Sequence, residues 1–179
     1  TSDFMVLDET TRRHLELTSS HLSQGGRAGS LLAMLDYTLT AMGGRLLRQW
    51  LSQPLCRLKP LQERQEAIAE LVEQSSRRSR LRQDLDTLID FERTLSRLAL
   101  GTATPRELIA LRRSLRRLPA IAIELRACRS AVLNALAVQW DPLEDLEALI
   151  AQAIVDDPPA TLRDGHVIRS GYHSELDAL

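Results

Sequence analysis

Histidines and adjacent carboxylates are the side chains of this chain best suited to metal binding or acid–base catalysis. They are His14, His21, His166, His173 and the pair Asp156-Asp157. A metal site needs three or more such groups at fixed spacing, and the sequence contains neither an HExxH motif nor a CxxC pair. Two prolines follow the aspartates, which favours a helix-terminating turn there over a cation site. The sequence therefore predicts no catalytic and no metal-binding residues.

Phosphate-binding and thiol chemistry are also poorly represented. The sequence has no glycine-rich loop followed by Lys-Ser or Lys-Thr, and no GxSxG motif. Gly43-Gly44 could admit a phosphate at a helix start, but such a pair is more typical of a tight turn and a close helix contact. Cys56 and Cys128 are far apart, which predicts two reduced, packed thiols. We therefore expect no cofactor in this chain.

Arginines form the most strongly charged feature of the sequence. Residues 57–130 carry sixteen basic and ten acidic side chains, whereas residues 131–179 carry two basic and nine acidic ones. Four arginines fall within two helical turns, namely Arg112, Arg113, Arg116 and Arg117, and a second group upstream is Arg77, Arg78, Arg80 and Arg82. Such groups could contact DNA phosphates or another domain. Aromatic residues make up only 3% of the chain, so a solvated or domain-facing helix surface is the favoured interpretation.

The elements that position these residues are predicted to be helices almost throughout. Asp8 can cap a helix that runs to about Leu17, and Ser30 can cap a short helix rich in leucine. Thr40 precedes a third helix that runs to about Leu51.

From residue 60 onward the apolar spacing becomes more regular. The buried face of one helix is predicted to contain Leu61, Ile68, Leu71 and Val72. A second stripe is predicted to contain Leu81, Leu85, Leu88, Phe91, Leu95 and Leu98. Its steps of three and four residues predict one long helix or two nearly collinear ones.

Two further helix starts combine a capping side chain, a proline at the first helical position and a glutamate that can reach back to the cap. They are Thr104-Pro105-Arg106-Glu107 and Asp141-Pro142-Leu143-Glu144. The helices behind them are too short for a free-standing coiled coil but suit helices packed side by side. Pro119 is predicted to end the first of them.

Extended structure is predicted only near the two ends of the chain. Phe4–Leu7 and Val167-Ile168 suit short extended pieces, and Ser174 is predicted to cap a last helix that carries Leu176 and Leu179. The apolar surface near these two leucines is expected to be incompletely covered. The predicted fold class is therefore all-α, a multi-helix bundle with short extended segments at its ends.

Composition is typical of a globular protein. The chain is 44% hydrophobic with a formal net charge of −1, and it has neither a long apolar run nor the features of a signal peptide at its start. We expect a cytoplasmic protein. Residues 1–179 are expected to form one domain, with a lead-in segment (1–29), a helical core (30–155) and a junction (156–179) into further helices.

Several stretches spread over almost the whole chain form a set of motifs. Near the start they are Leu7-Asp8, Thr11-Arg12-Arg13 and Leu15-Glu16-Leu17, and the next block is Ser30-Leu31-Leu32, Leu35-Asp36, Thr40-Ala41-Met42-Gly43, Arg45-Leu46-Leu47, Trp50-Leu51 and Pro54-Leu55. The middle carries Arg64-Gln65, Asp90-Phe91-Glu92-Arg93, Arg97-Leu98 and Pro105-Arg106-Glu107-Leu108. The last block is Asp157-Pro158-Pro159, Asp164-Gly165, Ile168, Gly171-Tyr172 and Glu175-Leu176-Asp177. Together they resemble the central core, or lever, domain of the MutS family of DNA mismatch repair proteins, although His14 stands where the family usually has asparagine.

The resemblance implies a discontinuous helical core domain, of which this chain holds the first and larger part. The family's mismatch-reading segment, connector, clamp, Walker-type ATPase and the helices returning from the clamp have no counterpart in this sequence. The implied role is mechanical and non-catalytic, namely coupling the ATPase to the DNA clamp. The parent protein is expected to bind mismatched duplex DNA, ATP and Mg²⁺, to form a homodimer, and to bind a MutL-like protein at the bacterial nucleoid.

Three alternatives remain open at this point. An autonomous helical adaptor or scaffold would bind partner helices and need no further domains. A small metal-dependent hydrolase would need the histidines and Asp156-Asp157 to converge. A MutS-like protein acting on recombination intermediates would differ in whether a mismatch-reading domain precedes Thr1.

Overall fold

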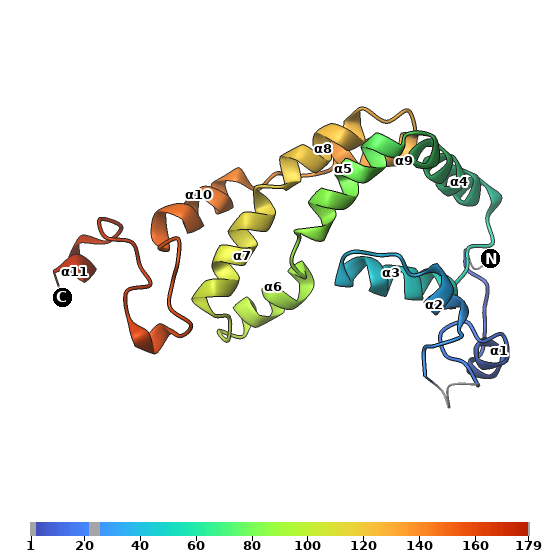
Figure 1. Cartoon of the computed structure of the whole chain (residues 1–179), viewed down its shortest axis with the longest axis horizontal. Coiled ribbons are helices and arrows are strands. Elements are labelled where there is room, and N and C mark those ends of the chain that lie inside the picture. The colour runs from blue at the N-terminus through green and yellow to red at the C-terminus, as the bar shows by residue number, and fades with distance from the viewer. Residues whose placement is uncertain (1–2, 22–25, 179) are drawn as a thin grey trace. The chain divides into compact units, whose positions relative to one another are not determined.

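The computed structural model describes residues 3–21 and 26–178, and its regular structure is almost entirely helical (Figure 1). The helices are α1 (Glu9–His14), α2 (Leu31–Leu35), α3 (Ala41–Ser52), α4 (Leu58–Glu73), α5 (Ser75–Asp86), α6 (Phe91–Ala99), α7 (Pro105–Leu115), α8 (Leu118–Arg126), α9 (Ala131–Val138), α10 (Glu144–Ala153) and α11 (Ser174–Asp177), with a 3-10 turn η1 (Leu162–Asp164). Within these described ranges, β structure is limited to two isolated bridges, Phe4 to Leu55 and Ile154 to Ile168. The predicted all-α class with short extended pieces near both ends is confirmed.

The chain divides into two compact units. The first unit comprises Thr1–Arg82 and Cys128–Asn134, and the second comprises Gln83–Ala127 and Ala135–Leu179. Each unit is thus built from two separate stretches of chain. The residues discussed as functional candidates lie within one unit or the other, so each unit is described by itself.

Side-chain caps fix most helix starts where the sequence predicts them. The predicted caps that accept a hydrogen bond from the backbone N–H three residues later are Asp8, Ser30 and Thr104, and Thr40, predicted only to precede its helix, makes the same contact. At Thr104 the box is complete, because Glu107 Oε2 in turn accepts the Thr104 backbone N–H at 2.7 Å. These contacts depend only on neighbouring residues, which is why the sequence predicts them correctly.

Two other predicted caps are wrong. Asp141 Oδ1 accepts the backbone N–H of Leu143 at 2.9 Å, a local turn that competes with capping, and α10 begins at Glu144 without a side-chain cap. Ser174 is the first residue of α11 and not its cap, and Asp177 Oδ2 accepts the Gly171 backbone N–H at 2.8 Å. In both places the aspartate carboxylate accepts a hydrogen bond from a loop N–H and does not cap the first turn of the helix.

The first helix ends earlier than predicted. α1 stops at His14 because Glu16 takes a left-handed conformation with φ of 49°. The Glu16 carboxylate accepts the Ser20 hydroxyl and the His21 backbone N–H, which stabilises this turn. These hydrogen bonds lower the pKa of Glu16, with the His21 N–H as the larger cause.

The long apolar stripe of residues 81–98 is divided between α5 and α6. The break lies at residues 87–90, where Asp90 caps α6 and the Ile89 backbone N–H donates to the buried Ser114 hydroxyl at 3.1 Å. Leu95, predicted to be buried, is 54% exposed, and Thr94 beside it is 7% exposed. Phe91 and Leu98 pack against the core as the stripe predicts, so Leu95 is the member of the α6 stripe that the prediction placed wrongly, and Thr94 takes the buried position.

The end of the next helix also differs from the prediction. α7 ends at Leu115, before Pro119 is reached, and Pro119 lies in the first turn of α8. A proline is tolerated there because the first amides of a helix have no intrahelical acceptor.

In the first unit, α4 turns a different face inward from the predicted one. Ile68 and Val72 are 62% and 63% exposed, whereas Ala67 and Glu70 are buried. The reason is tertiary, because both Glu70 oxygens accept backbone N–H groups at the start of α9, from Arg129 and Ser130, at 2.7 Å each. These hydrogen bonds lower the pKa of Glu70, with Arg129 as the largest cause. A buried carboxylate thus joins the two stretches of the first unit.

The second unit contains a continuous apolar core in which α7 packs against α10 and α6 (Figure 1). Its fully buried members are Ile109, Leu111, Leu115, Leu118, Ile150, Ile154 and Val167. Val167 belongs to the C-terminal segment, which the bridge between Ile154 and Ile168 attaches to the end of α10. The C-terminal segment is thereby part of this core.

Candidate functional site

The four arginines singled out by the sequence lie at the C-terminal end of α7 and just beyond it, in the second unit. The capping box at Thr104 sets the start of α7 and hence the face on which each arginine lies. Arg112 falls on the inward face and is buried, while Arg113, Arg116 and Arg117 are exposed. The four guanidinium groups therefore do not form one continuous surface.

Arg112 makes the most enclosed ion pair of the group. Its side chain is 7% exposed, and Nη2 lies 2.6 Å from Asp156 Oδ1. Its Nε faces Glu147 Oε1 on α10 at 3.9 Å, which is too long for a hydrogen bond. A buried guanidinium requires such carboxylate partners, so this arginine has a structural explanation.

Asp156 is shared between two arginines. Its Oδ2 lies 3.2 Å from Arg169 Nη2 in the C-terminal segment, while Oδ1 holds Arg112 on α7. Both contacts lower the pKa of the Asp156 carboxyl, with the Arg112 hydrogen bond as the larger cause. The aspartate pair predicted to terminate a helix does follow α10, and one member also links α7 to the C-terminal segment.

The remaining arginines of the cluster have different environments. Arg116 Nε lies 2.5 Å from Glu147 Oε1, and Arg117 Nη1 lies 4.0 Å from Asp84 Oδ1. Arg113 is exposed and forms no hydrogen bond or ion pair with the part of the chain that the structure describes. Contact of this cluster with DNA or another domain stays a prediction, and Arg113 is the member whose charge is not already paired.

The upstream arginines of α5 bind groups within the first unit. Arg78 Nη1 donates to the carbonyls of Leu71 and Val72 at the end of α4, at 2.6 and 3.0 Å. Arg82 Nη1 donates to the Tyr37 carbonyl at 3.1 Å. These arginines satisfy helix-end and loop carbonyls, a common role for cations near helix C-termini.

Two histidines of the first unit lie near each other. The rings of His14 and His21 are 6.5 Å apart, centroid to centroid. Over residues 3–21 and 26–178, no group of three or more His, Cys, Asp or Glu side chains is arranged to hold a metal ion.

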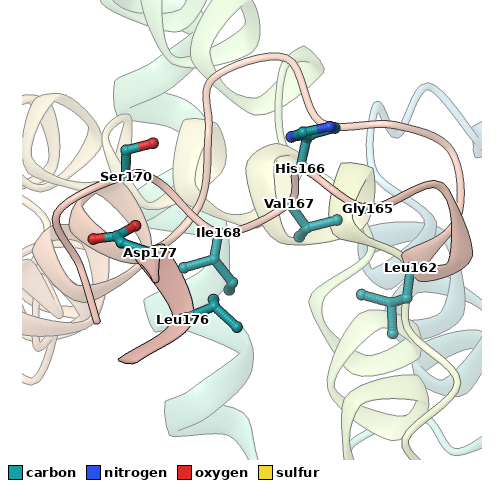
Figure 2. Close-up of a pocket in the computed structure, with 8 residues that line it drawn as sticks. All are labelled: Leu162, Gly165, His166, Val167, Ile168, Ser170, Leu176 and Asp177. Atoms are coloured by element: carbon teal, nitrogen blue, oxygen red, sulfur yellow. The ribbon is translucent and has the colours of Figure 1, made fainter. Parts of the chain in front are cut away.

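A pocket of about 500 Å³ lies in the C-terminal segment (Figure 2). Leu162, Val167, Ile168 and Leu176 supply its apolar side chains, with His166, Ser170 and Asp177 as polar groups. The Asp177 carboxylate already accepts a hydrogen bond from the Gly171 backbone N–H, and the other lining residues do not form a recognisable set of catalytic groups. Leu176 is exposed as predicted, whereas Leu179 lies outside the described residues.

The glycine pair lies in the first turn of α3 and not in a phosphate loop. A Cβ on Gly43 would lie 3.0 Å from Thr40 Oγ1, and one on Gly44 would lie 3.3 Å from Thr38 Oγ1. The carboxylate of Asp36 stands beside the same turn and pairs with Arg27. A close contact of the helix start with its own loop, as the sequence favours, explains both glycines.

Sequence reasoning missed Glu70, Glu147 and Arg169. None is part of a local motif, because each acts on residues from another element. One signal in the sequence is consistent with the contact of Glu147. The basic middle and acidic end of the sequence are complementary, and the pairs Arg112 to Asp156 and Arg116 to Glu147 join them.

No described helix combines the length and the apolar character needed to cross a membrane. The longest, α4, has 16 residues and carries several charges.

Comparison with known proteins gives a consistent result. The family model described as MutS domain III matches residues 10–179. The chain is 46% identical over 177 residues to the DNA mismatch repair protein MutS of Symbiobacterium thermophilum, covering 99% of this chain and 20% of that protein. It is 44% identical over 180 residues to the protein of the same name from Methanothrix thermoacetophila, covering 99% and 21%. The corresponding protein of Listeria innocua is 43% identical over 177 residues, covering 99% and 20%.

The chain spans about a fifth of the length of these relatives. The match extends over both units and over all four arginines of the α7 cluster. The chain therefore belongs to the MutS domain III family.

Proposed function

We propose that this chain is a non-catalytic domain of a DNA mismatch repair protein and couples an ATPase mechanically to a DNA-holding clamp. The observation that carries the proposal is the attachment of the C-terminal segment to the core of the second unit. Val167 is buried in that core, and Asp156 pairs with Arg112 of α7 and Arg169 of the segment. A displacement of α7 is therefore passed on to the segment that follows residue 166.

ATP and Mg²⁺ belong to other parts of the proposed parent protein. The residues of this chain do not fit them, because the sequence has no phosphate loop and the described part has no metal-binding cluster. Mismatch recognition, dimer formation and binding of a MutL-like protein are likewise proposed for the parent.

Exposed apolar side chains support contacts with the remaining domains. In the first unit, large hydrophobic residues that are mostly exposed include Val6, Met34, Tyr37, Leu58, Ile68 and Val72. Exposed apolar side chains are suited to contacts with other protein surfaces. We assign these residues to contacts with the connector, clamp and ATPase parts of the parent.

The unpaired charge of Arg113 is assigned to an interdomain contact in preference to DNA. Its neighbours Arg112 and Arg116 are neutralised by carboxylates of the same unit, so no broad basic surface remains around it. Non-specific DNA binding requires several phosphate contacts.

The proposal is tested by comparing this chain with the full-length protein that contains it. We expect the chain alone to show no ATP turnover above buffer and no preference for a G·T mismatch over homoduplex. The full-length protein should show both activities, and ATP should change its hold on the mismatch. Turnover or mismatch preference by the chain alone would contradict the non-catalytic role, and full-length protein without an ATP response would contradict the coupling.

A further inference from the structure

Arg169, which is partly buried, has several partners near the end of α10. Its Nε donates to the Ala151 carbonyl at 3.1 Å, and its Nη2 donates to the Ile154 carbonyl at 3.1 Å. The same Nη2 lies 3.2 Å from Asp156 Oδ2. One planar guanidinium thus caps the C-terminal end of α10 and binds a carboxylate, a geometry that lysine cannot reproduce.

The backbone around Arg169 is tied to the same place. The Arg169 N–H donates to the Ala153 carbonyl at 2.8 Å, and the Val155 N–H donates to the Val167 carbonyl at 3.1 Å. These two hydrogen bonds form a minimal antiparallel pairing across the bridge between Ile154 and Ile168. Such a short pairing is weak by itself and depends on side chains for support.

Asp156 connects this pairing to α7. Its two oxygens hold Arg112 and Arg169 separately, so one carboxylate bridges the helix and the C-terminal segment. Beyond Arg169, Ser170 and its neighbours are exposed and leave the core toward α11. Past this point the Tyr172 N–H donates to the Arg169 carbonyl at 3.1 Å, so the outgoing chain is attached to the pairing through Arg169.

We infer that Asp156 and Arg169 form a clasp that fixes the direction in which the chain leaves the core at Ser170. They are positioning residues, since they act through the pairing of residues 153–155 with 167–169. The inference rests on the proposed coupling function, and identifies the contact through which α7 controls the C-terminal segment.

The test uses the full-length protein with Asp156→Asn, Arg169→Gln and the double substitution. Asparagine keeps one acceptor oxygen, so only one of the two guanidinium groups retains its partner. Matched controls are Asp157→Asn and Arg163→Gln, which remove the same charges from exposed neighbours that bind no other group in the described ranges.

The first measurement is hydrogen exchange of the Val155 and Arg169 amides. Each single substitution should speed their exchange on the order of threefold, as expected for a partly exposed ion pair. The amides in the middle of α7 should keep their rates, and the double variant should exchange no faster than Arg169→Gln alone. Unchanged exchange at the two amides, or an equal increase throughout the second unit, would overturn the clasp.

The second measurement separates the clasp from the proposed function. We expect Arg169→Gln to keep basal ATP turnover and melting temperature while losing severalfold of the ATP-induced change in mismatch binding. Asp156→Asn should lose the same response, and its melting temperature should fall as well because the buried Arg112 loses a carboxylate partner. If the Val155 and Arg169 amides exchange faster but ATP still changes mismatch binding as in the unsubstituted protein, the clasp does not control the coupling. Absence of any ATP response in the unsubstituted protein would instead contradict the proposed function, and the exchange result would still decide the clasp.

Discussion

Glu70 Oε2 accepts a 2.7 Å hydrogen bond from the backbone N–H of Ser130, which lies sixty residues further along the chain. Its other oxygen accepts the Arg129 N–H, so a side chain of α4 satisfies two of the amides that precede α9. We expect Glu70→Ala to lower the melting temperature by about 5 °C. The hydrogen-exchange rates of the Arg129 and Ser130 amides should rise in the same variant.

The matched control for Glu70 is Glu66→Ala, one turn earlier on the same helix and exposed. Its substitution should leave both the melting temperature and the two amides nearly unchanged. Equal effects of the two substitutions would show that helix propensity, and not the contact with α9, determines the result.

The α7 core offers a comparison of two leucines. Leu115 is buried among α7 and α10 residues, and Leu115→Ala should lower the free energy of unfolding by about 2–5 kcal/mol. Leu95→Ala should lower it by less than about 0.5 kcal/mol, because that side chain is largely in water. Urea unfolding followed by circular dichroism measures both, and similar losses would contradict the placement of α6.

The capping box of α7 should contribute measurably to stability. Thr104→Ala removes the acceptor of the Glu107 N–H and should cost about 1 kcal/mol of unfolding free energy, while Thr104→Ser should be nearly neutral. The same urea titrations provide the measurement. A serine variant as unstable as the alanine variant would point to the lost methyl group as the cause.

Asp36 should contribute an acid-sensitive part of the stability. The Thr38 hydroxyl and backbone N–H, with Arg27, lower the pKa of Asp36 from 3.8 to about 2. Because the folded-state pKa is the lower one, this stabilisation is complete above pH 3.8 and is lost as the pH falls toward 2. Unfolding titrations at several pH values should show this loss, and Asp36→Asn should remove it. Thr38→Val, which deletes the first of these donors, should reduce it in part.

Substitution of Arg113, the exposed arginine of α7, distinguishes a contact with DNA from a contact with another domain. We expect Arg113→Gln to leave the free energy of unfolding within about 0.5 kcal/mol and to leave the salt dependence of duplex binding by the full-length protein unchanged. Arg112→Gln should destabilise the fold by about 1–3 kcal/mol, since it breaks a buried pair with partly exposed partners. A salt slope reduced by about one in Arg113→Gln would assign this arginine to a phosphate.

Local chemistry was the part of this fold that the sequence could predict. The caps at Ser30 and Thr40 and the box at Thr104 involve residues three positions apart, so their spacing is visible in the sequence. The all-α class follows from apolar periodicity for the same reason.

Contacts between distant segments were the part that it could not predict. Glu70 is buried because unpaired N–H groups of another segment require an acceptor, and no residue near it in the sequence indicates this. Leu95 continues the apolar period of its helix, yet Thr94 is buried in its place, while Phe91 and Leu98 of the same stripe do pack against the core. For Asp156, the sequence indicated the turn but gave no means of knowing which arginines the turn would meet.

The break between α5 and α6 has a mechanical meaning. A break between two helices is usually where a protein bends. The loop N–H groups there can exchange a protein acceptor for water at little cost in free energy. Here the Ile89 N–H donates to the Ser114 hydroxyl. Ser114 is fully buried, so water cannot readily replace it as the acceptor. The hydrogen bond attaches the loop between α5 and α6 to α7, so under the proposed coupling a displacement of α7 would displace Ile89 with it.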